Sequence, residues 1–361
     1  MKNRLIAVVL SFAAAALMTG CGSNEKSDAI RIGAILPLTG DYADVGNWMQ
    51  TGMKLALDEI NANREKKITV IYEDSQSKAA VGVKAYRKLK DVYGIRYFIS
   101  TVTPVCLALK PLVVADENFM LVNAGHRELT SEKTPTIFRH ALTMTQEAKF
   151  LATEVIKRQK SSLGSSFCFV YANNDIGLEV RDVFLKEMPM TPLLVLSYEE
   201  SDKDMKNLSA QIISRNPDFV VICGYTKNLG VLIKNIRENS YMKPIYVNQG
   251  FSTPSVKAVA GKYGINVFYS DYAIPESAGI NHLKDELRVQ FSSALSPHSI
   301  TAYNALKVIA NATDRSPSKD PLSVSSAIKQ NAPYDINGMK LEINNIGDIY
   351  VPLILVENIP E

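Results

Sequence analysis

Histidines, cysteines and paired carboxylates are the residues of this 361-residue sequence that could carry chemistry. The four histidines are scattered, with no two at a spacing that would hold a metal ion from one helix. Glu73 and Asp74 are adjacent and could act as acid and base, but we favour a solvated or hydrogen-bonded strand end as the explanation of this pair. The motifs of serine hydrolases, zinc peptidases, P-loop NTPases and dinucleotide-binding enzymes are absent from the sequence. We therefore expect a protein that is not an enzyme and needs no cofactor or metal.

Six loops offer polar side chains and backbone N–H groups instead. Each follows a short apolar stretch, and several lead directly into a helix: 38–45, 100–105, 123–128, 172–176, 224–228 and 248–252. Ligands of open parallel sheets bind beyond the carboxyl ends of the strands, and the first N–H groups of a helix attract anions. The loops therefore predict a small-solute site. In the third loop, His126 and Arg127 could each contact the solute or be solvated surface residues.

The elements that position these loops alternate between strand and helix. The expected strands cover 30–36, 68–72, 97–99, 119–122, 167–171, 193–196, 219–223, 245–247, 267–269, 339–343 and 349–356. A second series of elements begins near Thr145, and the helices between the strands are amphipathic. Short apolar strands separated by such helices indicate parallel βαβ units. The sequence therefore predicts an α/β fold with two doubly wound parallel sheets.

Composition agrees with a globular body of two domains. The net charge of +3 comes without a clustered basic surplus, so we expect no nucleic-acid partner. The chain is longer than a single core usually supports. Cys168 and Cys223 fall in apolar strands, where they could be inert thiols or, if geometry allows, a disulfide.

The N-terminal segment is predicted to be a targeting signal. Lys2 and Arg4 precede an uncharged apolar run over 5–17, which is too short to cross a hydrocarbon layer of about 30 Å. Residues 18–21 resemble a bacterial lipobox, so residues 1–20 would be a lipoprotein signal peptide, Cys21 the lipidation site, and 21–28 a polar tether. The alternative is a plain signal peptide with a chance cysteine. We expect a protein of the periplasm or cell surface that meets the membrane only through an N-terminal lipid.

Motifs along nearly the whole mature chain resemble type I periplasmic binding proteins of the branched-chain amino-acid-binding (Leu/Ile/Val-binding) family of ABC transporters. They include 32–40 (IGAILPLTG), 52–61 (GMKLALDEIN), 72–75, 128–130, 137–139, 174–177, 223–225 and 303–306 (YNAL). The resemblance implies two lobes joined by three crossovers, near Ala141, Ala273 and Asn344. The first lobe would comprise 29–141 and 274–343, and the second 142–273 and 344–361. It also implies capture of a small organic solute between the lobes and delivery to an ABC permease in the inner membrane. We expect a monomer.

The same resemblance implies ligand-binding positions. Amino-acid binders of this family hold the ligand carboxylate with two first-lobe residues, whose positions correspond to Pro104 and Arg127 in this sequence. Thr103 and Gly125 lie in the same two loops and are also predicted to contact the solute. Arg127 could pair with a carboxylate or remain in solvent.

In the second lobe, a glutamate that holds the ammonium corresponds to Gln249, whose neutral amide cannot make a charge-assisted bond. Tyr225 matches an aromatic that contacts the ammonium end, and other aromatic positions fall on Val45 and Ile176. Trp48 could line the pocket or pack in the core. We therefore favour a carboxylate or neutral polar solute, with an amino acid still open.

Two other functions are compatible with these residues. The same fold could serve an envelope sensor that passes occupancy to a signalling partner instead of a permease. An exported enzyme would need a nucleophile–base pair or metal cluster, which the sequence does not offer.

Overall fold

The computed structural model describes residues 30–40, 42–62, 64–65, 67–159, 165–202 and 204–360. The expected signal peptide, the lipidation site at Cys21 and the tether lie outside the described residues. Within the described part of the chain, no helix has both the length and the apolar character that a membrane span requires.

The first lobe is built on a parallel sheet with the strand order β2-β1-β3-β4-β5. Its strands are β1 (Arg31–Leu36), β2 (Thr69–Asp74), β3 (Tyr97–Thr101), β4 (Phe119–Asn123) and β5 (Ile137–Arg139). One face packs against α2 (Ala79–Asp91) and α3 (Thr103–Ala115). The other packs against α1 (Ala43–Ala62), α9 (Ala278–Phe291), α10 (Pro297–Arg315), α11 (Pro321–Gln330) and the hairpin of β11 (Tyr334–Ile336) and β12 (Met339–Leu341). Burial on both faces explains why the inner strands β1, β3 and β4 are largely apolar, whereas the edge strand β2 is only half-buried and ends in two acids.

The second lobe has the strand order β13-β10-β9-β8-β6-β7. Its strands are β6 (Phe167–Ala172), β7 (Leu194–Tyr198), β8 (Phe219–Cys223), β9 (Ile245–Val247), β10 (Val267–Tyr272) and β13 (Leu353–Glu357). Strand β13 runs antiparallel to β10, and the other strands are parallel. Helices α4 (Met144–Gln159) and α5 (Asp175–Glu187) cover one face, and α6 (Lys206–Ser214), α7 (Lys227–Glu238) and α8 (Pro254–Ala260) the other.

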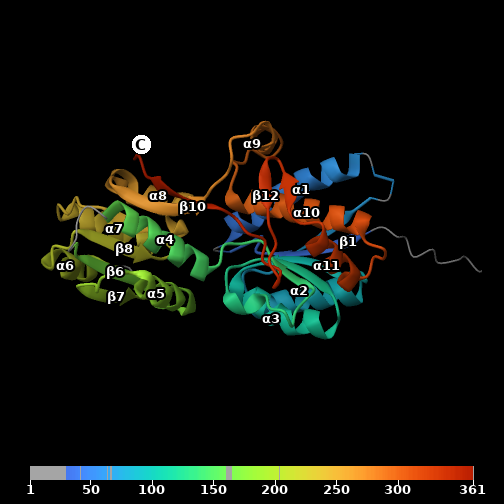
Figure 1. Cartoon of the computed structure of the whole chain (residues 1–361), viewed down its shortest axis with the longest axis horizontal. Coiled ribbons are helices and arrows are strands. Elements are labelled where there is room, and N and C mark those ends of the chain that lie inside the picture. The colour runs from blue at the N-terminus through green and yellow to red at the C-terminus, as the bar shows by residue number, and fades with distance from the viewer. Residues whose placement is uncertain are drawn as a thin grey trace, which may run out of the picture.

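The chain passes between the lobes three times, after β5, after β10 and between β12 and β13. Figure 1 shows the lobes side by side, with the C-terminal end on the second lobe. The first two passages leave from the carboxyl ends of β5 and β10. Because the parallel strands of one sheet share a direction, the carboxyl ends in each lobe are turned toward the other lobe. We call these two edges the interlobe face.

Several element boundaries differ from the sequence-based expectation. Helix α1 begins at Ala43, whereas Gly46 was expected to open it. A Cβ at Gly46 would lie 2.1 Å from the carbonyl oxygen of Pro37, so this glycine permits close packing of α1 on the segment that follows β1. Helices α8 and α11 and strands β5 and β11 were not predicted, because segments of three to ten residues show little periodicity.

The three cysteines in the described residues are free thiols and buried. Cys168 packs with the core on the α7 side of the sheet, and Cys223 with the core on the α4 side. Because they lie on opposite faces of one sheet, these two thiols cannot form the disulfide that the sequence left open.

Candidate functional site

The predicted first-lobe residues gather at the carboxyl ends of neighbouring strands. Thr103 and Pro104 open α3 directly after β3, and Gly125 and Arg127 follow β4. Pro104 and Arg127 are exposed. Val102, which directly precedes Thr103, has a φ of +69°, and this backbone conformation is strained for a β-branched residue. Such strain recurs at ligand sites, where the surrounding structure enforces it.

Val45 and Trp48 lie in the first turns of α1, which follows β1. Val45 is half-buried and packs against the first-lobe core, so it has at least a structural role. The Trp48 ring is parallel to the ring of His298, with 6.2 Å between centroids and 4° between planes. The indole is thus placed by an aromatic partner at the start of α10 that the sequence did not single out.

His298 is held by a defined hydrogen-bond network. The amide nitrogen of Asn123 donates to the His140 carbonyl at 2.7 Å and to the Thr301 hydroxyl at 2.8 Å. The Asn123 Oδ1 must therefore accept from His298 Nδ1, 3.0 Å away. Burial lowers the pKa of His298 to about 4. At neutral pH its Nε2 consequently carries a lone pair and is a hydrogen-bond acceptor.

The predicted second-lobe residues also follow strands. Ile176 lies in the first turn of α5 after β6, Tyr225 follows β8, and Gln249 opens a short 3-10 helix (Gln249–Ser252) after β9. All three side chains are half-buried. The ligand residues predicted from the sequence, in both lobes, therefore all lie on the interlobe face.

Beneath this second-lobe surface is a carboxylate that the sequence analysis missed. Glu147, in the first turn of α4, is fully buried. Its Oε1 accepts from the Gln249 backbone N–H and the Ser270 hydroxyl, and its Oε2 from the Tyr225 hydroxyl at 2.8 Å. Burial raises the pKa of Glu147, and these hydrogen bonds oppose the shift.

The passages between the lobes are tied together by a buried ion pair. Arg139, at the end of β5, donates from Nε at 2.9 Å and from Nη2 at 2.8 Å to the two carboxylate oxygens of Asp348, in the third passage. The guanidinium also donates to the Thr130 hydroxyl and the His126 carbonyl. The backbone N–H of Leu142, in the first passage, donates to the Tyr272 hydroxyl at the end of β10, 3.3 Å away. These bonds fix where the three passages meet.

Next to this ion pair, His140 is fully buried, and neither ring nitrogen has a hydrogen-bond partner. Burial lowers its pKa from 6.5 to about 4. As pH falls, the unfolded chain therefore binds a proton before the folded one. The neutral His140 ring therefore contributes about 3 kcal/mol to the free energy of unfolding. This contribution is complete above pH 6.5 and is lost as the pH falls toward 4.

Replacing His140 by leucine should accordingly flatten the fall of unfolding free energy between pH 6.5 and 4. Urea unfolding at several pH values measures this slope. The matched control is His282→Leu at an exposed position of α9, which should retain the wild-type slope. An unchanged slope in His140→Leu would show that another group causes the acid sensitivity.

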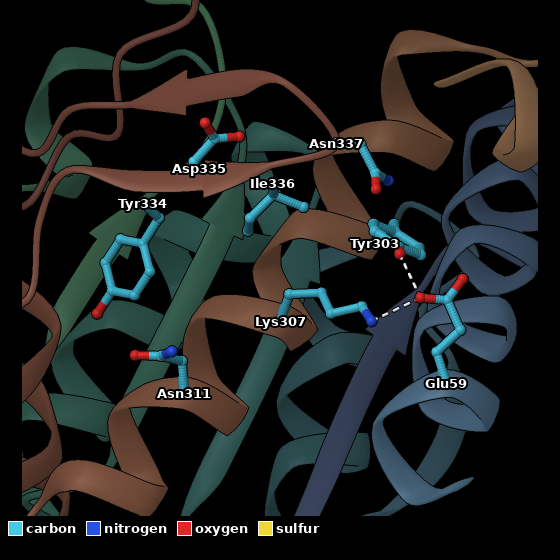
Figure 2. Close-up of a pocket in the computed structure, with 8 residues that line it drawn as sticks. All are labelled: Glu59, Tyr303, Lys307, Asn311, Tyr334, Asp335, Ile336 and Asn337. Atoms are coloured by element: carbon cyan, nitrogen blue, oxygen red, sulfur yellow. Dashed lines mark hydrogen bonds and ion pairs between the residues drawn. The ribbon is translucent and has the colours of Figure 1, made fainter. Parts of the chain in front are cut away.

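A separate depression of about 290 Å³ lies on the first lobe between α1, α10 and β11. In it, Glu59 accepts hydrogen bonds of 2.6 Å from both the Tyr303 hydroxyl and the Lys307 ammonium, as Figure 2 shows. It is lined by none of the predicted ligand residues. Since its acid is already paired, we place the candidate solute site on the interlobe face instead.

Comparison with known proteins agrees with this architecture. The periplasmic binding protein family matches residues 29–347. A relative named Leu/Ile/Val-binding protein homolog 3, from Brucella melitensis, is 22% identical over 355 residues and aligns over 95% of each chain.

Solved structures extend the likeness. The substrate-binding protein LivJ of a branched-chain amino acid transporter from Streptococcus pneumoniae, in complex with isoleucine, has a TM-score of 0.81 at 17% identity, covering 91% of this chain and 95% of its own. A solute-binding protein of an ABC transporter from R. palustris, in complex with benzoate, has a TM-score of 0.77 at 18% identity, covering 91% and 93%. The chain belongs to the periplasmic binding protein family, which confirms the predicted family and fold class.

Proposed function

We propose that this protein captures a small organic solute between its lobes and delivers it to an ABC permease. The observation that carries the proposal is the gathering of the predicted ligand residues of both lobes on the interlobe face. A solute that contacts both lobes binds the closed arrangement more tightly, so occupancy favours closure. Membership of the periplasmic binding protein family implies a location outside the cytoplasm and a small solute as ligand.

The site would use Thr103, Pro104, Gly125 and Arg127 for an anionic group of the solute. The positive end of the α3 helix dipole and the exposed guanidinium of Arg127 both favour a carboxylate. Both isoleucine and benzoate, found in the neighbouring structures, carry that group.

The opposite wall would be formed by Ile176, Tyr225 and Gln249 of the second lobe. Val45 and Trp48 would line the apolar part of the site, with the Trp48 ring supported by His298. Aromatic faces of this kind bury much area at small conformational cost.

We also propose that residues 29–141 with 274–343 and residues 142–273 with 344–361 move as two bodies. The mature protein would be a monomer, attached to the membrane through a lipid on Cys21. It would have no catalytic activity, in keeping with relatives that are solute-binding proteins.

A thermal-shift screen tests the capture of a solute. Amino acids, organic acids and amides are added to the protein, and a ligand at 100 times its Kd should stabilise the native state by about 2.7 kcal/mol. At least one member should raise the melting temperature, and calorimetry should confirm binding at a single site. Failure of the whole panel to bind would contradict the proposal.

Transport and sensing on this fold differ in the partner that reads occupancy. Deletion of the gene should abolish uptake of the radiolabelled hit if the protein serves a permease. Unchanged uptake, together with a lost transcriptional response to the same solute, would favour the sensor.

A further inference from the structure

The side chain of His298 stands among the proposed solute residues of the first lobe. It lies in the first turn of α10, and its ring is parallel to that of Trp48 in the first turns of α1. Its Nδ1 is hydrogen-bonded to Asn123, the last residue of β4. Because α1 follows β1, both neighbours of His298 lie at carboxyl ends of strands, and His298 itself therefore lies on the interlobe face.

The orientation of the Asn123 amide is determined by its other neighbours. Its nitrogen lies 2.7 Å from the carbonyl oxygen of His140, which can only accept a hydrogen bond. The same nitrogen lies 2.8 Å from the hydroxyl of Thr301, whose own proton is donated to the carbonyl oxygen of His298. Both of these oxygens need a donor, so the amide oxygen of Asn123 must be the atom that faces the His298 ring.

This orientation decides which ring nitrogen of His298 carries the proton. The amide oxygen of Asn123 has no hydrogen to donate, so Nδ1 of His298, 3.0 Å away, is the N–H donor. A neutral imidazole has one N–H, which leaves Nε2 with a lone pair. At pH 8 the ring is neutral even with the ordinary histidine pKa of 6.5, so this tautomer does not depend on the shift that burial causes.

The Nε2 lone pair is accessible from the interlobe face. The two nitrogens of an imidazole point in different directions, so Nε2 is directed away from Asn123 and the end of β4. Among the residues that the structure describes, Nε2 of His298 has no hydrogen-bond partner. It is also not one of the buried atoms that lack a partner, in contrast to both ring nitrogens of His140. His298 therefore presents a free acceptor whose position is fixed by Asn123 and Trp48.

An acceptor fixed in this way discriminates between solutes. Trp48 offers an apolar ring face beside it, against which an aliphatic or aromatic group can pack. A solute without a donor would displace water from Nε2 of His298 and leave the lone pair unpaired, which costs free energy. A hydroxyl group would replace the water and keep the hydrogen bond. Sites that bind a hydroxyl in this manner strongly reject the analogue that lacks it.

We propose that His298 is a specificity-determining residue of the solute site, whose Nε2 accepts a hydrogen bond from a hydroxyl group on the part of the solute that contacts Trp48. The inference rests on the proposed function and deepens it by naming a solute class. That class is small organic acids with a hydroxyl group remote from the carboxylate, which stays assigned to Arg127 and the start of α3.

Calorimetry with solutes that differ in one hydroxyl group tests the selection. Each of 4-hydroxybenzoate and 3-hydroxybenzoate is compared with benzoate, tyrosine with phenylalanine, and threonine with valine, where the hydroxyl replaces a methyl group. The full-length wild type should bind at least one hydroxylated member about tenfold more tightly than its partner, the value of about one hydrogen bond. Equal or tighter binding of the partner in every pair that binds overturns the inference. Binding of no panel member contradicts the proposed function itself.

His298→Phe keeps an aromatic ring beside Trp48 and removes the acceptor. The preference for the hydroxyl should fall to within about twofold, whereas affinity for the partner without it should stay within about threefold of wild type, because the ring contact remains. The control, His282→Phe, makes the same exchange at an exposed position of α9 in the same lobe and should keep the wild-type preference. A preserved preference in folded His298→Phe overturns the inference, whether or not the overall affinity falls.

Nitrogen NMR of the imidazole rings is a second measurement that needs no substitution at His298. In ¹⁵N-histidine-labelled wild type at pH 8, His298 should be protonated on Nδ1 and not on Nε2. Its signals are identified by elimination in His126→Gln, His140→Leu and His282→Leu. The Nε2 signal should lie at lower chemical shift with the hydroxylated solute bound than with its partner bound, because only the former donates to the lone pair. A ring protonated on Nε2, or equal shifts in the two complexes, contradicts the inference.

Discussion

Replacing Arg139 by methionine is expected to lower the free energy of unfolding by about 3–5 kcal/mol, the loss typical of a broken buried ion pair. The substitution leaves the Asp348 carboxylate nearly buried without its cation. It also removes the donors to the Thr130 hydroxyl and the His126 carbonyl. Urea denaturation followed by circular dichroism measures the change.

Two controls separate this ion pair from general effects of losing an arginine. Arg288→Met removes a guanidinium whose side chain is 74% exposed, and should change stability by less than about 0.5 kcal/mol. The double replacement of Arg139 by methionine and Asp348 by leucine should recover part of the loss, because no unpaired charge is left. A loss below about 1 kcal/mol in Arg139→Met would show that the lobes' junction does not depend on this pair.

Replacing Tyr225 by alanine is expected to weaken binding of the tightest solute in the panel by about 30-fold, or about 2 kcal/mol. The ring is a half-buried aromatic on the interlobe face, and its hydroxyl connects that face to Glu147. Truncation removes apolar contact and leaves one oxygen of Glu147 without its donor. Isothermal titration calorimetry on wild type and variant measures the ratio of Kd values.

The matched control for that experiment is Tyr263→Ala. Tyr263 is also half-buried in the second lobe, but it precedes β10 and so lies at the amino edge of the sheet. Its loss should leave the Kd within about twofold of wild type. If both variants bind like the wild type, the solute does not contact the interlobe face at Tyr225.

The general fold follows from local sequence pattern. Apolar runs such as 219–223 and the helical stripe over Leu229–Ile236 reflect burial that any parallel α/β sheet imposes, so they predict strand and helix from a few neighbouring residues. The rule that ligands bind beyond the carboxyl ends of such strands then locates the candidate loops. The residues predicted in those loops all lie on the interlobe face.

Contacts between distant residues account for what could not be predicted. Arg139 and Asp348 are 209 positions apart, and Asn123 and His298 are 175 apart. Glu147 stands in an amphipathic helix, where a carboxylate usually faces solvent, and only the fold brings Gln249 and Ser270 against it.

The most direct test of solute capture between the lobes is a distance measured across the interlobe face. Spin labels are placed at exposed positions in the first turns of α1 and α5, using Asn47→Cys and Asp175→Cys in a chain with Cys21→Ser, since the native thiols of the described residues are buried. Double electron–electron resonance is recorded with and without the solute identified in the screen. We predict a shorter distance when the solute is bound. An unchanged distance at saturating solute would contradict capture by closure of the two lobes.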